Sequence, residues 1–240
     1  MDEDGYFGEA VAERYDDDES EMFAPAVLAA TADRLAELAE GGRALEFAIG
    51  TGRIALPLAE RGVEVHGIEL SRAMLARLRA KPGGADIPVT IGDMATTRAP
   101  GEFQLVYLVF NTIGNLTTQD AQVDCFANAA AHLAPGGRFL IEVGVPDLRR
   151  LPPGQTAVPF HVGETSWGFD TYDVATQAMT SHHIAEGRHS WTPFRYVWPA
   201  ELNLMARLAG MRLAARWSGW HREEFTSEST KHVSVWTYDP

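Results

Sequence analysis

A strand followed by two glycines is the strongest chemical signal in this chain of 240 residues. Residues 45–54 read LEFAIGTGRI, an apolar run that meets Gly50 and Gly52. Glycines at such a junction let the backbone approach a ligand closely, beside the N–H groups of a following helix. The spacing from Gly50 to Gly52 to Ala55 also fits the dinucleotide fingerprint in its alanine-ended form. The segment therefore predicts a nucleotide-like ligand at the end of a strand.

Two acidic residues follow the next two predicted strands. Glu69 comes 17 residues after Gly52, where a carboxylate can accept hydrogen bonds from a ribose diol. The alternative is a glutamate that caps a helix starting near Ser71. After the third strand, Asp93 can accept from an exocyclic adenine amine while Met94 packs against the ring. The alternative there is a plain turn.

A third group of candidates, Phe110 and Asn111, stands at the end of the fourth predicted strand. Strand order in a doubly wound sheet reverses beside the first strand, and ligands bind at that switch point. We therefore expect these residues to lie near the same ligand.

Strands and helices alternate through the first 145 residues. Hydrophobic periodicity and Pro/Gly breaks predict helices over 23–40, 54–61, 71–81 and 117–133, and strands over 43–49, 64–68, 89–91, 103–110 and 138–145. Such βαβ units build a parallel sheet with right-handed crossovers. The expected class is α/β, with a doubly wound, Rossmann-like sheet.

The pattern changes after Pro146. Short runs over 167–174, 177–185 and 190–197 predict added antiparallel strands, and 199–209 a helix. The last two runs, 211–218 and 232–238, predict a terminal antiparallel hairpin. We divide the chain into an N-terminal helical cap segment (1–42) and one domain (43–240), with an antiparallel β insertion at about 151–198 that covers the substrate.

Together these motifs resemble the class I S-adenosylmethionine-dependent methyltransferases over nearly the whole chain. The resemblance implies a seven-stranded, mostly parallel sheet in the order 3-2-1-4-5-7-6, and S-adenosyl-L-methionine as cofactor, with S-adenosyl-L-homocysteine as product. It implies that Gly50 and Gly52 lie under the methionine part, and that Glu46 orients the cofactor's amino group. The cofactor residues implied are Glu46, Ala48, Gly50, Gly52, Arg53, Glu69, Leu70, Asp93, Met94, Phe110 and Asn111.

One position departs from the family motif, because residue 48 is usually glycine and is Ala48 here. A methyl group there can crowd the loop. Tyr15 resembles a tyrosine near the family's N-terminus that closes over the cofactor; an exposed tyrosine is the alternative.

Candidate catalytic residues besides Tyr15 are His182 and His183, since a histidine can act as a general base near neutral pH. Neighbours on a strand point to opposite faces, so at most one of them should face the substrate. We predict no metal site, because no histidine pair has helical i, i+4 spacing and Cys125 is the single cysteine.

The predicted reaction is in-line transfer of a methyl group to an oxygen, nitrogen or carbon of a small molecule. One alternative is an NAD(P)-dependent oxidoreductase, but neither Lys81 nor Lys231 follows a tyrosine at the Tyr-x-x-x-Lys spacing of its short-chain type. A non-catalytic nucleotide-binding protein is the other.

Composition limits the partners. The net charge is −13 with only two lysines, which disfavours nucleic acid. No apolar run reaches the roughly 18 residues of a membrane span, and residues 1–21 lack the features of a signal peptide. We expect a cytoplasmic protein with a small-molecule partner, as monomer or homodimer.

Overall fold

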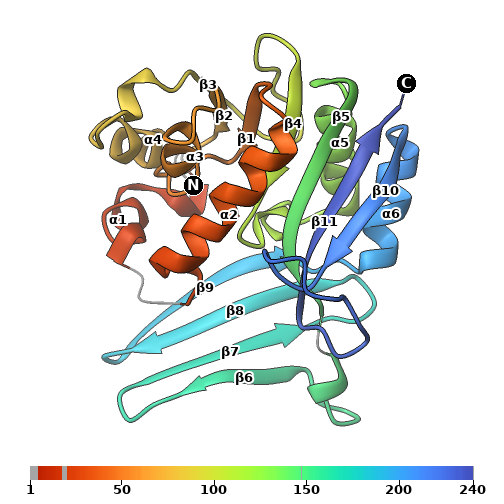
Figure 1. Ribbon diagram of the computed structural model, residues 1–240. Helices are drawn as coiled ribbons and strands as arrows, with labels where there is room; N and C mark the ends of the chain where they lie inside the picture. Colours follow the sequence, from red (N-terminus) through yellow and green to blue (C-terminus); the bar gives the residue numbers. More distant parts are fainter. Residues whose placement is uncertain (1–4, 18–20, 147, 240) are drawn as a thin grey trace.

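The chain folds around one seven-stranded sheet, described here from a computed structural model for residues 5–17, 21–146 and 148–239 (Figure 1). Its strands are β1 (Ala44–Phe47), β2 (Val65–Glu69), β3 (Val89–Ile91), β4 (Phe103–Leu108), β5 (Leu133–Gly144), β10 (Met211–Trp217) and β11 (Lys231–Tyr238). They lie in the order β10-β11-β5-β4-β1-β2-β3. The first five are parallel, and β11 runs antiparallel to both of its neighbours, β5 and β10. The expected order, 3-2-1-4-5-7-6 with a terminal hairpin, is confirmed.

Helices cover both faces of this sheet (Figure 1). They are α1 (Glu9–Ala12), α2 (Pro25–Ala39), α3 (Ala55–Ala59), α4 (Arg72–Arg79), α5 (Gln119–Ala130) and α6 (Pro199–Leu208). Leu35, Leu58 and Leu78 pack α2, α3 and α4 into one core cluster, whereas Phe126 and Leu202 of α5 and α6 belong to another. Each face of a parallel sheet needs such a cover because its strands are apolar on both sides. None of the helices described has both the length and the apolar character needed to span a membrane.

Two element boundaries differ from the prediction for a local reason. The helix expected over 117–133 ends at Ala130, and Leu133 already pairs with Phe103 as the start of β5. The glycine-containing turn at 135–137 lies inside this long strand, where the register shifts against β4. The helix expected over 54–61 is shorter than predicted and spans Ala55–Ala59. The predicted cap is present: the Ser71 hydroxyl accepts from Met74 N.

A second, four-stranded antiparallel sheet follows the parallel core. It contains β6 (Ala157–Val162), β7 (Ser166–Tyr172), β8 (Ala178–Ala185) and β9 (Arg188–Arg195), in that order. The sequence pattern indicated the last three but missed β6, because Pro159 interrupts its run. An edge strand tolerates proline, since one of its sides needs no N–H donors.

Arg195 anchors this second sheet to the core. Its guanidinium contacts the Gln122 side chain of α5 at 2.5 Å and pairs with Glu201 of α6 at 2.7 Å. The Gln122 amide in turn donates to the Arg195 carbonyl. Because these groups are buried and hydrogen-bonded to one another, they fix the sheet below the carboxyl ends of the parallel strands (Figure 1).

Candidate functional site

The glycine loop after β1 has the left-handed backbone that a close approach requires. Ala48, Gly50 and Gly52 have φ values of 53°, 57° and 78°. A Cβ on Gly52 would stand 2.3 Å from Leu78 Cδ1, so only glycine fits there. Ala48 adopts the unfavourable conformation that glycine would take at this position, at a cost of roughly 1–2 kcal/mol. Its methyl group packs against the core as well as lining the pocket.

Glu69 ties the glycine loop to the end of β2. One of its carboxylate oxygens accepts from Gly50 N at 2.8 Å and the other from Ser71 N at 2.7 Å. The residue is only 5% exposed. The helix-capping alternative is therefore confirmed in part, because the carboxylate bonds to the start of α4, and the ribose role of Glu69 stays a prediction. A carboxylate has about four acceptor positions, so one carboxylate can serve more than two donors.

The residues expected at an adenine ring lie at the ends of β2 and β3. These strands pair with Glu69 opposite Ile91, which brings Leu70 and Asp93 to the same edge of the sheet. Leu70 is 49% exposed, an apolar surface with no core to cover it. Asp93 is exposed and accepts from Ala95 N at 2.8 Å. Met94 instead packs into the core, so Leu70 offers the larger apolar surface to a ring.

A buried acid lies below the loop. Glu46 accepts a hydrogen bond from the Tyr107 hydroxyl at 2.8 Å. Burial raises the pKa of Glu46 to about 8, against the lowering effects of Tyr107 and of the nearby Arg53 guanidinium. A cation placed beside this carboxyl would favour its ionised form. The pocket therefore fits a ligand that brings an ammonium group.

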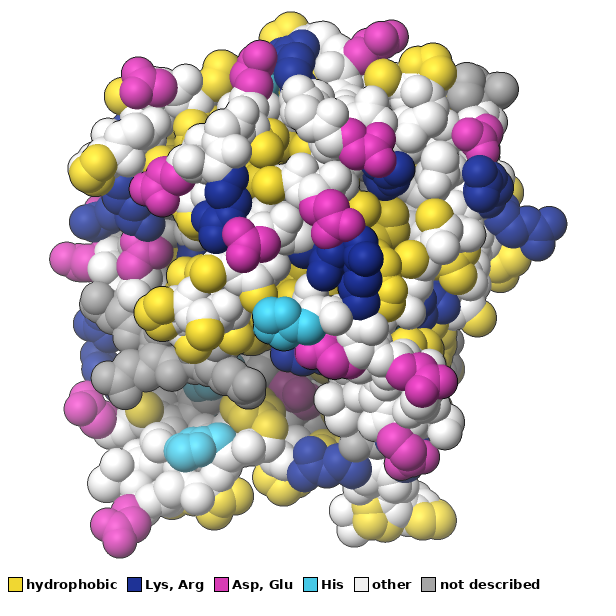
Figure 2. Space-filling view, in the orientation of Figure 1, with side chains coloured by type: hydrophobic (Ala, Val, Ile, Leu, Met, Phe, Trp, Pro, Cys, Tyr) yellow, Lys and Arg dark blue, Asp and Glu magenta, His cyan; other side chains and the backbone are white. Residues whose placement is uncertain are grey.

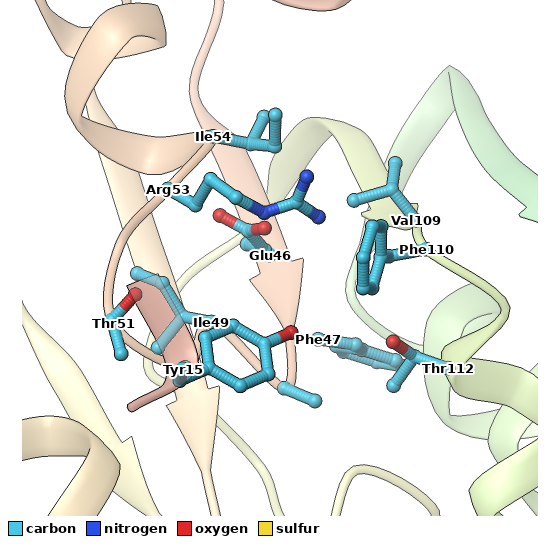
Figure 3. A pocket seen from close by; sticks show the side chains of 12 residues that line it. Tyr15, Glu46, Phe47, Ile49, Thr51, Arg53, Ile54, Val109, Phe110 and Thr112 are labelled. Atoms are coloured by element: carbon cyan, nitrogen blue, oxygen red, sulfur yellow. The ribbon is translucent and has the colours of Figure 1, made fainter. Parts of the chain in front are cut away.

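Arg53 spans the same pocket (Figure 3). Its guanidinium lies 3.9 Å from the ring centre of Phe110 and 4.6 Å from that of Phe23. It also donates to the Met22 carbonyl at 2.9 Å. A guanidinium held in this way can bind a carboxylate, so Arg53 and Glu46 together suit the two charged groups of an amino acid.

The turn after β4 is strained and well supported. Phe110 and Asn111 both adopt left-handed φ values, 66° and 60°. Glu142 of β5 holds the turn, because its carboxylate accepts from Phe110 N at 3.1 Å and from the Trp220 indole at 3.2 Å. The Asn111 side chain accepts from Gly144 N at 2.6 Å. Consecutive left-handed residues cost free energy and cluster at functional sites.

The N-terminal segment closes the pocket from above. Tyr15 lines it (Figure 3), and burial raises the pKa of Tyr15 to about 12. Its neighbour Asp16 accepts from the Thr51 hydroxyl at 2.7 Å and pairs with Lys81 at 2.7 Å. The remaining space is about 20 Å³, room for a water molecule. An amino-acid part of a ligand needs more room than this space offers.

A second, larger cavity opens on the other side of the Phe110–Asn111 turn. It measures about 520 Å³ and lies where the molecule is hollowed between the parallel core and the second sheet (Figure 2). We call it the acceptor cavity. Its walls come from the 111–114 turn, the end of β5 and the inner face of the second sheet. Aromatic and aliphatic side chains dominate, among them Phe160, Tyr172, Met179, Phe194 and Tyr196.

The two candidate histidines lie on opposite faces of β8, as strand alternation predicts. His182 stacks on Phe169 at 4.6 Å and on His189 at 5.2 Å, on the face away from the acceptor cavity. His183 is on the same face as Ser181, which lines the cavity. The strand geometry thus disfavours His182 as a catalytic residue.

Two carboxylates near the cavities were not among the predicted site residues. Glu142 of β5 supports the Phe110–Asn111 turn, and Asp170 of β7 lines the acceptor cavity. Strand alternation predicts which residues of β7 share a face with Asp170. Only the pairing of the strands shows that this face is the one that lines the cavity. Within the described part of the chain, no three His, Cys, Asp or Glu side chains come close enough together to hold a metal ion.

The chain is similar to known methyltransferases. Residues 44–137 match the family model described as a methyltransferase domain. The CcbJ methyltransferase from Streptomyces caelestis is 33% identical over 98% of each chain, with a TM-score of 0.84. The cypemycin N-terminal methyltransferase from a Streptomyces species is 27% identical and covers 82% of this chain and 83% of its own. An S-adenosylmethionine-bound amino pentose methyltransferase from Micromonospora echinaspora, 24% identical over 95% of each chain, has a TM-score of 0.71.

Proposed function

This chain belongs to the class I S-adenosylmethionine-dependent methyltransferases, and we propose that it methylates an amine nitrogen of a small molecule. The nicotinamide oxidoreductase alternative finds no support among its relatives. Two relatives are named as an N-terminal methyltransferase and an amino pentose methyltransferase, and an amine acceptor agrees with both names.

The residues around the glycine loop fit the cofactor in three places. In this proposal Glu69 accepts from the ribose, and Leu70 with Asp93 contacts the adenine. Glu46 and Arg53 offer opposite charges to the ammonium and carboxylate of the methionine part. S-adenosylmethionine supplies a methyl group already activated on a sulfonium, so the protein has mainly to position the acceptor, about 3 Å from that carbon in a dry site.

The titratable groups in the cofactor pocket support nitrogen as the acceptor atom. Tyr15 has a pKa of about 12 and stays protonated, Arg53 is a cation, and Glu46 is buried below the loop behind the Tyr107 hydrogen bond. A hydroxyl acceptor needs a base that takes its proton during attack. A neutral amine attacks with its lone pair and loses the proton afterwards. Of the two acceptors, this set of groups therefore suits the amine.

The test uses pairs of compounds that share a skeleton and differ only in an amine or a hydroxyl. The purified protein is incubated with S-adenosylmethionine and each compound, and products are identified by the added mass of a methyl group. We expect methylated amines and no reaction of the matched alcohols. Methylation of an alcohol at a comparable rate would contradict the proposal.

Cofactor binding is measured separately by calorimetric titration with S-adenosylhomocysteine, NAD and NADP. We expect binding of the homocysteine compound alone. Should that compound bind while no amine in a broad panel reacts, the non-catalytic alternative becomes the better interpretation.

A further inference from the structure

A half-buried carboxylate that pairs with no described lysine or arginine faces the acceptor cavity. Asp170 stands in the middle of β7, directly opposite Ser181 of β8. The Ser181 and Tyr172 hydroxyls are its hydrogen-bond donors, the latter at 3.4 Å. In the regions 5–17, 21–146 and 148–239, no lysine or arginine forms an ion pair with Asp170. Burial raises the pKa of Asp170, while the two hydroxyls and the histidines of β8 lower it.

The other charged residue on the cavity wall is already neutralised. Arg195 pairs with Glu201 at 2.7 Å and contacts the side-chain oxygens of Gln122 and Gln177. Its side chain is 5% exposed. Among the described residues that line the cavity, Asp170 is therefore the one charged side chain that has no ion pair with a residue of opposite fixed charge, and the histidines of β8 are the basic groups that act on it.

The surroundings of Asp170 are apolar and aromatic. Phe160, Tyr172 and Phe194 line the same cavity. A carboxylate that loses water contacts without gaining a cation is destabilised, and aromatic faces attract cations. The cavity thus combines the two features that bind an amphipathic ammonium compound.

We propose that Asp170 determines acceptor specificity by binding a protonated amino group of the acceptor. This inference rests on the proposed function, since it treats the cavity as the acceptor site. A protonated nitrogen has no lone pair, so the group held by Asp170 is an anchor, and the methyl group goes to another nitrogen. An acceptor that carries a nucleoside diphosphate is correspondingly disfavoured, because its phosphates would face an uncompensated carboxylate.

Two probes of nearly equal shape test this inference without any methyl transfer. The whole protein, saturated with S-adenosylhomocysteine, is titrated calorimetrically with 2-phenylethylammonium chloride and with 2-phenylethanol in an amine-free buffer. We expect the cation to bind at least tenfold more tightly than the alcohol. Equal affinities, or no binding of the cation, would overturn the inference while leaving the cofactor site intact.

Two variants test whether the preference for the cation over the alcohol arises from Asp170. Asp170→Asn keeps the shape of the side chain, and we expect it to reduce the ratio of the two affinities to about one. Glu186→Gln removes one negative charge from the exposed β8–β9 turn, where Glu186 pairs with Arg188, and should leave the ratio unchanged. A tenfold preference that survives in Asp170→Asn would place the cation elsewhere and overturn the inference. If that variant fails to fold, Asp170→Glu replaces it, and the cation preference should persist in it.

Discussion

The two cavities on either side of the Phe110–Asn111 turn are built from different parts of the chain. On the glycine-loop side, backbone groups and buried acids form the cavity. Glu69 bonds to two main-chain N–H groups, and Glu46 lies below a left-handed loop. On the acceptor side, side chains of an antiparallel sheet form the wall. A binding site made of backbone geometry restricts which residues can stand there, whereas a wall of side chains can change one residue at a time. Substitutions should therefore cost most on the first side.

The largest expected effect comes from Gly52→Val. Its side chain would meet Leu78 at a position where the backbone is already left-handed, so the loop must shift. We expect loss of S-adenosylhomocysteine binding by more than about 100-fold, measured by calorimetry. Gly62→Val is the matched control, because Gly62 has a similar φ of 82° with open space around it. Micromolar binding retained by Gly52→Val would show that the cofactor lies elsewhere.

Glu69→Ala should have the next largest effect. Removal of hydrogen bonds to a charged group costs about 1.5–3 kcal/mol, which corresponds to roughly 10- to 150-fold weaker binding of S-adenosylhomocysteine. Part of the cost arises through Gly50 and Ser71, whose N–H groups lose their acceptor. Glu60→Ala, an exposed glutamate after α3, serves as control. An unchanged affinity in Glu69→Ala would remove the ribose from this carboxylate.

The pH dependence of cofactor binding tests the charge complementarity of the glycine-loop side. Glu46 has a pKa of about 8 in the free protein, close to the ordinary value for an α-amino group. The pair binds best with the carboxyl ionised and the amine protonated, so affinity should peak near pH 8. It should fall about 20-fold by pH 6, where Glu46 binds a proton, and fall again above pH 9, where the amine loses one.

Glu46→Gln separates the two declines in cofactor affinity, toward low pH and toward high pH. The amide does not titrate, so the decline toward pH 6 should disappear while the decline above pH 9 stays. Calorimetry in two buffers of different ionisation enthalpy should show proton release on binding below pH 7 in the wild type alone. A flat profile in the wild type would mean that Glu46 does not meet the cofactor's amino group.

The same contrast explains what the sequence could predict. The glycine loop, Glu69 and Leu70 follow one another at strand ends, so local pattern and resemblance were enough to identify them. Asp170 and Glu142 depend on which strand pairs with which and on which face turns inward, and no local pattern encodes that. β6 was not predicted because Pro159 interrupts the residue pattern of this edge strand. Strand alternation predicts only that His182 and His183 lie on opposite faces of the second sheet. The register of β8 against its neighbours was needed to tell which of them faces the acceptor cavity.

The smallest expected effect is the one of replacing His183, compared with its neighbour His182. This comparison tests whether the side chains that line the acceptor cavity can be changed one at a time. His183 lies within hydrogen-bond distance of Ser181, 3.3 Å between Nε2 and Oγ, beside Asp170. His183→Ala should raise the KM for an amine found by the screen about two- to threefold, the effect of one weak polar contact, and leave kcat unchanged. His182→Ala is the matched control on the outer face, where the ring contacts Phe169 and His189, and should alter neither constant. A loss of kcat in either variant would mean that a histidine of β8 takes part in the chemistry, and the inner and outer faces of the second sheet would then have to be reassigned.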